Sequence, residues 1–346
     1  MKRYLKFAET IILITIFLSC NSNPLEEPIA PGRRDYTWTV DTLNSPFNYF
    51  FGLWGSKHDD VWAVGSGGSS TDRLWHFDGI KWSLYNKEPI FCTGNALWGS
   101  TKNNVWMVGG DGKIWHYNGI VWSENFVYKV DNAYSISIED IWGRSNNDIY
   151  AVGLITLNSN KEQNGFILYF NGNKWSEIYR ANYSSQFNGV LGDSKNIFVS
   201  GARITNINNH ITIDSMYIKR LINNSLKNVI AANDGSWVEP ATVGGNVHFV
   251  SGNELYKYEN NSVKKVYNFA GYNFGQAVYG RSMNDLFVRM TDGIAHYNGI
   301  DIVYLFKFND NFASYVGRPL DFGDYIFFNI ADIGNGRNYN LRGKLN

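Results

Sequence analysis

The sequence lacks an excess of charge of either sign, and this excludes several classes of partner. It contains 31 Lys and Arg residues and 31 Asp and Glu residues, so its formal net charge at pH 7 is +0. The first 19 residues, which we interpret below as a targeting segment, hold three of the basic residues and one of the acidic ones, so the remaining chain has a net charge of −2. A chain so close to neutral is not expected to bind nucleic acid, or to bind an anionic membrane through a polybasic surface.

Two further absences bear on the class of fold. No segment of useful length repeats its apolar residues with the period of a helix, which argues against a helical fold. The apolar run Ile11–Leu18 has only eight residues, whereas a membrane-spanning helix needs about 20. Pro-rich tracts, charge runs and low-complexity insertions are missing after residue 35, so we expect one domain over residues 35–346.

Cysteine is scarce as well, because Cys20 and Cys92 are the only two. The stretch Phe17-Leu18-Ser19-Cys20 follows a basic start and the apolar run, and it resembles the bacterial lipobox, whose Cys becomes the lipidated first residue. The resemblance implies that residues 1–19 are a lipoprotein signal peptide and that Cys20 is the lipidation site, which would hold the protein at a membrane. An ordinary cleaved signal peptide is the alternative. With Cys20 lipidated, Cys92 has no disulfide partner, and we interpret it as a small buried apolar residue rather than a nucleophile.

The segment after Cys20 has the composition of a linker. Residues 20–34 contain Pro24, Pro28, Pro31 and Gly32 but no strand-length apolar run, which predicts a flexible tether. Asn21, rather than Asp, follows the Cys. By resemblance to other lipoproteins this implies the cell envelope and an outer-membrane anchor, facing either the periplasm or the cell surface.

Three near copies of one motif organise the rest of the chain. Their Trp-Gly pairs begin at Trp54, Trp98 and Trp142, which are 44 residues apart. In the copy Leu97–Ser123, short runs rich in Val, Ile, Trp and Tyr alternate with turn residues, which is typical of four successive strands. Asp-Gly or Asn-Gly recurs at positions 78, 118, 171 and 298 and predicts tight two-residue type I′ turns.

Four antiparallel strands in about 40–45 residues, repeated, predict an all-β fold, a β-propeller. The strands are apolar on both faces, as in Val61–Val64, which stacking of blades explains. Fainter copies continue to the C-terminus, so we expect seven four-stranded blades, with six as the alternative. Tyr36–Val40 resembles the start of a fourth strand and is expected to complete the last blade and close the ring. The Trp residues at 82, 122 and 175 are expected to wedge between neighbouring blades.

The unit W-G-S-x-x-x-D-V-W-A-V-G…H-Y-D/N-G-x-x-W-S is similar to repeats of secreted propellers and lipoproteins of Bacteroidetes and myxobacteria. The resemblance extends over residues 50–345 and implies the fold, but it does not identify an activity. Asp78-Gly79-Ile80-Lys81-Trp82 keeps only part of the sialidase Asp-box, so sialidase activity is not implied.

No local motif for chemistry stands out. His76, His116 and His296 occupy the same place in three blades, so we interpret them as structural rather than as a metal site. His58-Asp59-Asp60 is interpreted as a turn, and Gly65–Ser69 lacks the features of a phosphate loop. We expect no metal and no cofactor.

The predicted site lies where the copies differ. The residue four positions before the Gly that follows each first strand is Asn95, Glu139, Asn188 or Gln276, and these polar side chains are expected to rim the mouth of the central channel. The connections before first strands supply aromatic residues that could stack on sugar rings, namely Tyr134, Tyr183, Phe187, Tyr272 and Phe274. The longest second-to-third-strand loops are expected at Leu154–Gly165 and Ala202–Asp214, where repeat folds often carry recognition.

These features favour a monomeric, membrane-anchored binding module without catalytic activity, which displays one propeller face to a polysaccharide or an envelope protein. The alternative is a carbohydrate-active hydrolase or lyase whose acidic groups, such as Glu139, come from separate blades. A purely structural envelope protein is a third hypothesis.

Overall fold

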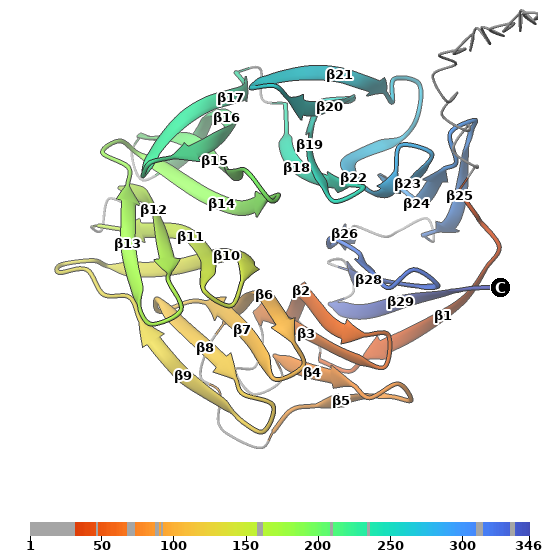
Figure 1. Ribbon diagram of the computed structural model, residues 1–346, viewed down its shortest axis with the longest axis horizontal. Helices are drawn as coiled ribbons and strands as arrows, with labels where there is room; N and C mark the ends of the chain where they lie inside the picture. The colour runs from red at the N-terminus through yellow and green to blue at the C-terminus, as the bar shows by residue number, and fades with distance from the viewer. Residues whose placement is uncertain are drawn as a thin grey trace, which may run out of the picture. The chain divides into compact units, whose positions relative to one another are not determined.

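The computed structural model describes residues 32–45, 48–67, 73–86, 90, 93–157, 162–207, 210–233, 236–308, 314–332 and 336–346. In this part of the chain, seven blades of antiparallel strands surround a central axis (Figure 1), and a single parallel pairing, Val243↔Gly280, joins the fifth and sixth blades into one sheet. The sequence-based prediction of a seven-bladed propeller is confirmed. The predicted signal peptide, Cys20, nearly all of the tether and Cys92 lie outside the described residues.

The blades follow one another in chain order. Blades 1 to 3 are β2 (Asn48–Lys57), β3 (Asp60–Gly67), β4 (Leu74–Phe77) and β5 (Trp82–Leu84); β6 (Gly94–Thr101), β7 (Asn104–Gly109), β8 (Lys113–Tyr117) and β9 (Trp122–Val127); and β10 (Ser135–Ser145), β11 (Asp148–Thr156), β12 (Gln163–Phe170) and β13 (Trp175–Arg180). Blades 4 and 5 are β14 (Ser185–Gly192), β15 (Ile197–Ile207), β16 (His210–Ile222) and β17 (Ser225–Ala232); and β18 (Val238–Val243), β19 (Asn246–Ser251), β20 (Glu254–Glu259) and β21 (Ser262–Asn268). Blade 6 is β22 (Phe274–Ser282), β23 (Asp285–Met290), β24 (Gly293–Tyr297) and β25 (Ile302–Lys307).

Blade 7 joins the two ends of the domain. It contains β26 (Ser314–Val316), β27 (Leu320–Asp321), β28 (Tyr325–Asp332), β29 (Arg337–Leu345) and, as its outermost strand, β1 (Tyr36–Leu43). β1 pairs with β29 from Tyr36↔Leu345 to Leu43↔Asn338, so the expected N-terminal closing strand is confirmed. Just before β1, Arg34 donates from Nη1 to Asp301 Oδ1 at 2.6 Å and from Nη2 to the His296 carbonyl at 2.9 Å. The closing strand is therefore also attached to blade 6.

Tryptophan and glycine explain the spacing of the repeat. The indole of each Trp-Gly pair lies over the Gly of the next blade: an added Cβ on Gly99 would lie 2.6 Å from a Trp54 ring carbon, and one on Gly143 would lie 2.7 Å from Trp98. Real Cβ contacts are not this short, so the flat ring requires a neighbour without a side chain.

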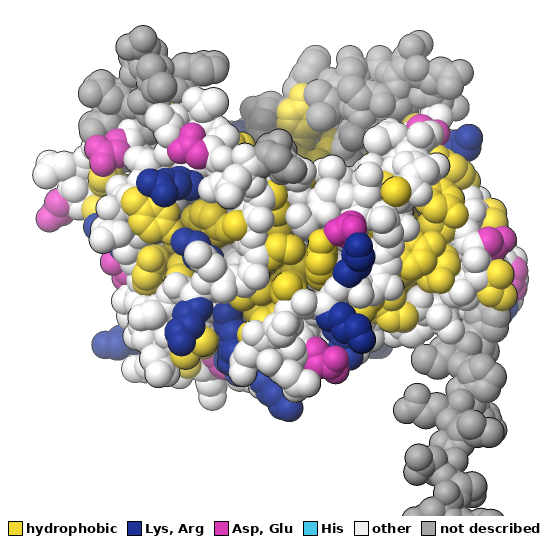
Figure 2. Space-filling model, turned by 90° about the horizontal axis from the view of Figure 1, so that it is seen from above, with side chains coloured by type: hydrophobic (Ala, Val, Ile, Leu, Met, Phe, Trp, Pro, Cys, Tyr) yellow, Lys and Arg dark blue, Asp and Glu magenta, His cyan; other side chains and the backbone are white. Residues whose placement is uncertain are grey.

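The outer Trp residues wedge between blades as predicted. Trp122 is fully buried and packs edge-on against Trp62 of blade 1, with ring centroids 5.5 Å apart. Trp175 packs in the same way against Trp106 of blade 2 at 5.6 Å. Because blades stack face to face, Val61–Gly65 is buried at every position, which explains the missing polar alternation. Figure 2 views the ring edge-on, and its outer surface shows an apolar band with Lys and Arg side chains gathered mainly below it.

The prediction of type I′ turns at Asp-Gly and Asn-Gly is wrong. In these turns only the Gly has a positive φ, for example +93° at Gly119. The Asn118 carboxamide oxygen accepts hydrogen bonds from the N–H groups of Ile120 and Val121 at 2.9 and 3.0 Å, and this side-chain bonding stabilises a four-residue loop instead. Two-residue turns with positive φ at both positions occur elsewhere, at Asn223-Asn224 and Asn260-Asn261.

The three histidines of the repeat bond within their own blades through Nε2, and His296 Nδ1 also accepts from Arg34 Nε at 3.3 Å. Nε2 of His76, His116 and His296 lies 2.7, 2.7 and 2.6 Å from a side-chain oxygen of Asp60, Asn104 and Asp285. Each partner is the first residue of the second strand, or lies at its start, so the contact ties the third strand to the second. Within the described residues, no helix is long and apolar enough to cross a bilayer.

Candidate functional site

The first strands of blades 1 to 4 each contain a β-bulge near the channel. The register shifts between Phe50 and Gly52, Gly94 and Ala96, Ile138 and Asp140, and Phe187 and Gly189. The residues left without a partner are Phe51, Asn95, Glu139 and Asn188. A bulged residue leaves the ladder and its side chain is re-aimed, and all four of these residues line one cavity. The structure thus brings together three of the four polar residues that the sequence singled out.

This cavity lies in the central channel and has a volume of about 560 Å³. All seven blades contribute to its lining, and about half of the lining surface is apolar, with Leu53, Leu97 and Leu191 among the residues. The polar and ionisable lining residues are Asn95, Glu139, Asp140, Asn188, Thr242, Glu239, Tyr279, Arg289, Tyr315 and Arg318. Three carboxyl groups therefore share the cavity with two guanidinium groups.

Asp140 and Arg318 form a contact between blades 3 and 7. Asp140 Oδ2 accepts a hydrogen bond from the Val190 N–H at 3.0 Å and lies 3.4 Å from Arg318 Nη1. Burial raises the pKa of the Asp140 carboxyl, and Arg318 together with the backbone N–H groups opposes that rise. Gly189 leaves room for the contact, since an added Cβ would lie 2.5 Å from Ser200 Oγ and 3.5 Å from Asp140 Oδ2.

Arg318 is surrounded by the blades, yet its side chain is accessible to solvent. Its side chain is 52% exposed, because the space around it is the channel and not packed core. Enclosure by the surrounding blades lowers the pKa of Arg318, but the charges of Asp140 and Glu239 raise it more, so the net shift is upward. The guanidinium therefore stays cationic. Among the described residues its one hydrogen bond is the long contact to Asp140, so most of its donors are available to a ligand.

Arg289 has a different role, because its donors point at backbone carbonyls. Its Nε donates to the Gly275 carbonyl at 2.6 Å and its Nη1 to the Val316 carbonyl at 3.5 Å.

The carboxyl group of Glu139 lies in an enclosed position. Burial is the main reason that its pKa is raised, and the neighbouring Asp140 raises it further. Such a group holds a proton at higher pH than an exposed Glu does.

Aromatic side chains lie beside these charges. The Tyr315 ring is 39% exposed and packs edge-on against Phe51, with centroids 5.1 Å apart. Trp237 is also partly exposed, and its indole Nε1 donates to Glu239 Oε1 at 2.6 Å. The site thus offers apolar ring faces next to donors and acceptors.

Part of the predicted site is corrected by the structure. Gln276 is not among the residues that line the cavity, although Ala277 is. Blade 6 has a longer bulge, with the register moving from Phe274 directly to Ala277, and Gln276 has a φ of +62°. Inserting two residues in place of one changes which side chain reaches the channel.

The predicted loop aromatics divide into two groups. Tyr134 and Tyr272 are exposed, and Tyr183 lines a separate hollow on blade 4. Phe187 and Phe274 were wrongly placed in loops: both lie in first strands and are buried in the cores between blades.

The prediction of two long loops, at Leu154–Gly165 and Ala202–Asp214, was also wrong in large part. Leu154–Thr156 pairs with Gln163–Gly165, and Ala202–Ile207 pairs with β16, so these residues belong to extended strands and not to loops.

Sequence reasoning missed Asp140, Glu239, Arg289, Tyr315 and Arg318. The last four lie in blades 5 to 7, where the sequence resembles the repeat only weakly, so they could not be found by alignment with the clear copies. Among the described residues, no group of three or more His, Cys, Asp or Glu side chains is arranged to hold a metal ion.

Comparison with known proteins supports the fold. No protein-family model matches the sequence, and no curated protein sequence matches it. A catalytically inactive virginiamycin B lyase from Staphylococcus aureus, solved with quinupristin, is similar to this chain with a TM-score of 0.61 and 15% identity, over 88% of this chain and 99% of the lyase. YCF48 bound to D1 peptide is similar with a TM-score of 0.58 and 15% identity, over 92% and 99% of the two chains. BBS1N in complex with ARL6DN is similar with a TM-score of 0.57 and 12% identity, over 91% and 98%. At these identities the likeness concerns the fold.

Proposed function

We propose that this protein is a membrane-anchored, non-catalytic binding module that receives a segment of a polysaccharide or of an envelope protein at the mouth of its central channel. The observation that carries the proposal is the convergence of bulged residues from separate blades on one cavity. Bulges that re-aim side chains are frequent beside functional sites. Anchoring would come from a lipid on Cys20, in the outer membrane.

The chemistry of the cavity suits a ligand with many hydroxyl or amide groups. Arg318 and the amide of Asn188 can donate hydrogen bonds, and Glu139 can accept them. The Asn95 amide nitrogen already donates to the Ile138 carbonyl at 3.0 Å and to Ser137 Oγ at 3.3 Å, so Asn95 offers its amide oxygen as an acceptor. Tyr315 and Phe51 offer ring faces of the kind on which sugar rings and apolar side chains stack. With three carboxyl groups against two guanidinium groups, the cavity carries no large excess of charge, which favours a nearly neutral segment over a polyanion or polycation.

Two of the similar structures are complexes with a peptide or with another protein, in keeping with a binding role for this fold. They do not identify the ligand of this chain.

A glycan array and a protein pull-down with the full chain test the proposal. Replacing Arg318 by Gln is expected to weaken capture of the retained ligand at least tenfold, about 1.4 kcal/mol, because the free guanidinium donors are lost. Arg337→Gln is the matched control, since Arg337 lies in the same blade, is exposed and is not among the residues that line the cavity. Equal capture by the two variants, or no retained ligand at all, would count against a channel site.

A carbohydrate-active hydrolase or lyase is the second candidate, and the raised pKa of Glu139 is the observation that favours it. A carboxyl that keeps its proton to higher pH than an ordinary Glu is better suited to act as a general acid on a glycosidic oxygen. Under this hypothesis, any glycan retained by the array is cleaved, and Glu139→Gln abolishes cleavage while retention persists. Retention without turnover by the unaltered chain supports the binding module instead.

A further inference from the structure

Blade 4 differs from the other blades in the length of its middle strands. β15 has 11 residues and β16 has 13, whereas the neighbouring strands stop earlier. β14 pairs with β15 only as far as Ser185↔Arg203, and β17 pairs with β16 only as far as Met216↔Ala232. Beyond those pairs the hairpin continues alone to Ile207↔His210. The sheet thus steps from four strands to two.

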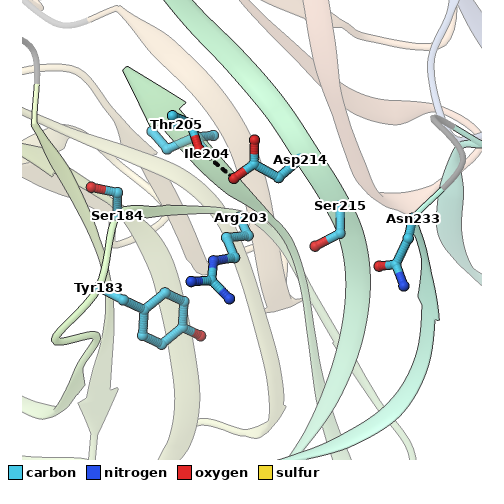
Figure 3. Close-up of a pocket in the computed structure, with 8 residues that line it drawn as sticks. All are labelled: Tyr183, Ser184, Arg203, Ile204, Thr205, Asp214, Ser215 and Asn233. Carbon is cyan, nitrogen blue, oxygen red and sulfur yellow. Dashed lines mark hydrogen bonds between the residues drawn. The ribbon is translucent and has the colours of Figure 1, made fainter. Parts of the chain in front are cut away.

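A hollow of about 520 Å³ lies at this step. Its lining residues are Tyr183, Ser184, Arg203, Ile204, Thr205, Asp214, Ser215 and Asn233. Figure 3 shows the Arg203 guanidinium in the middle, with Tyr183 on one side and Ser215 and Asn233 on the other. Asp214 is the extra residue of a bulge in β16, because the register moves from Arg203↔Ser215 to Ile204↔Ile213.

The charges in this hollow leave one cation available. Arg203 is exposed and has no hydrogen-bond or ion-pair partner within the part of the chain that the structure describes. Other arginines are paired, such as Arg144 with Asp148 and Arg281 with Asp321. The Asp214 carboxylate is already engaged, since Thr205 Oγ1 donates to its Oδ2 at 2.5 Å.

A second cationic side chain, Lys219, contacts Tyr183. Lys219 Nζ donates to the Tyr183 hydroxyl at 2.6 Å and lies 4.2 Å from the centroid of the Tyr217 ring. These contacts fix the Tyr183 ring at the wall of the hollow. The hollow therefore combines the free Arg203 guanidinium, the Asp214 carboxylate bonded to Thr205, a fixed aromatic side chain and neutral hydroxyl and amide groups.

A second hollow extends the first toward blade 5. It has a volume of about 570 Å³ and shares Asn233 with the first. Its other lining residues are Ala231, Ala232, Ser236, Ser251, Gly252, Asn253, Glu254 and Tyr256. Small, hydroxyl and amide side chains dominate this lining. Because Asn233 lines both hollows, we treat them together and call them the blade 4–5 track.

We propose that the blade 4–5 track binds an acidic polysaccharide, with the carboxylate of one uronic acid residue on Arg203. A guanidinium binds a carboxylate through two parallel hydrogen bonds. Tyr183 would contact the face of the sugar ring, and Ser215 and Asn233 would bond its hydroxyl groups. Arg203 can bind the carboxylate of one sugar, while the neutral polar groups of the lining bind hydroxyls. Of the two carboxylates in the lining, Glu254 is paired with Lys265 at 2.8 Å and Asp214 is bonded to Thr205. This site is separate from the channel and does not depend on the function proposed for it.

Calorimetric titration of the full chain tests the proposal. Hexagalacturonate is the acidic probe, and maltohexaose is a neutral probe of equal length. We expect the acidic probe to bind at least tenfold more tightly than the neutral one at 0.15 M salt, where long-range charge effects are screened. Equal affinities for the two probes, or no binding of hexagalacturonate, would overturn the proposal. So would inorganic phosphate that displaces hexagalacturonate with equal affinity, since that result indicates a simple anion site.

Three variants locate the binding. Arg203→Gln is expected to lower affinity for hexagalacturonate at least tenfold, and Arg203→Lys, which keeps the charge but not the paired donors, is expected to fall between that variant and the unaltered chain. Lys227→Gln is the matched control, since it removes the same charge from an exposed position near the opposite end of β17. A loss with Lys227→Gln equal to that with Arg203→Gln would indicate nonspecific attraction and overturn the site. A loss with Arg318→Gln, with none for Arg203→Gln, would move the ligand to the channel and also overturn it.

Discussion

At the outer ends of blades 1, 2, 3 and 6 the same contacts recur, whereas at the inner ends of the blades the equivalent position changes from copy to copy. The four outer turns use Asp78, Asn118, Asn171 and Asn298 in the same way, each accepting two backbone N–H bonds from the residues two and three positions later. The inner bulges present Phe51, Asn95, Glu139 and Asn188 in turn. Repetition marks contacts that hold the ring together, and variation marks positions where the strand ladder does not determine the side chain, although Asn95 still bonds to the Ile138 carbonyl of blade 3 at 3.0 Å.

The difference has a physical cause. An outer turn must solve the same problem in each blade, which is to reverse the chain with its polar groups satisfied. A bulged residue makes no ladder contact, so its identity affects stability less and can be set by a ligand. Residues retained for function often carry some cost in stability. The comparison therefore predicts that changes to the repeated contacts destabilise the protein, whereas changes at the inner bulges do not.

Trp122→Ala should have the largest effect on stability. Trp122 is fully buried and bridges blades 1 and 2 through Trp62. Removing a buried Trp ring costs about 3–5 kcal/mol, because a cavity replaces both its apolar contacts and its aromatic contact. Urea unfolding of the full chain measures the change. Ile120→Ala, in the same turn but 73% exposed, is the control and should stay within about 0.5 kcal/mol. Similar losses in the two variants would contradict the role given to Trp122.

Gly119→Ala should have the second largest effect. Gly119 has a φ of +93°, and an added Cβ would lie 2.4 Å from Asn103 Oδ1. Backbone strain and this close approach together should cost about 1–3 kcal/mol. Gly245→Ala is the control, because Gly245 also has a positive φ, +72°, but has nothing within 4 Å of the added atom. If the control is equally destabilised in urea unfolding, backbone conformation alone explains the cost and the crowding of the repeated turn contributes nothing.

The same contrast explains how far the sequence predicted the molecule. The Trp-Gly spacing and the apolar strands predicted seven blades, because every copy buries the same faces and one template describes them all. The closing strand was predicted for the same reason, since Trp38 matches the template. The type I′ turns were missed because side-chain bonding by Asn118 and its equivalents competes with backbone preference.

The site could be predicted only where blades still resemble the template. Asn95, Glu139 and Asn188 were found by counting back from a glycine, and this worked because each bulge inserts one residue. Gln276 failed because the bulge of blade 6 inserts two. Arg318 and Glu239 had no template position to be counted from. The positions of Asp140 and Glu239 around Arg318 depend on how blades 3, 5 and 7 face one another across the channel, which no local pattern records.

Glu139→Gln should have the smallest effect and the opposite sign. Burial raises the pKa of Glu139 above its ordinary value, so the folded state binds this proton more tightly than the unfolded state does. At pH 7 the ionised carboxylate therefore reduces the free energy of unfolding, and the reduction disappears as the pH falls below the pKa of the unfolded state. Gln cannot ionise, so the variant should be more stable than the unaltered chain at pH 7 and nearly equal to it at pH 4.

Urea unfolding at the two pH values measures this difference, and Glu124→Gln, at an exposed position of β9, is the control that changes the same charge outside the channel. A Glu139→Gln variant that is less stable at pH 7 would show that the carboxylate stabilises the fold, as the contacts of the outer turns do. That result would contradict the proposed difference between the outer turns and the inner bulges. A more stable variant that has lost ligand capture would place Glu139 among the residues kept for binding at the expense of stability.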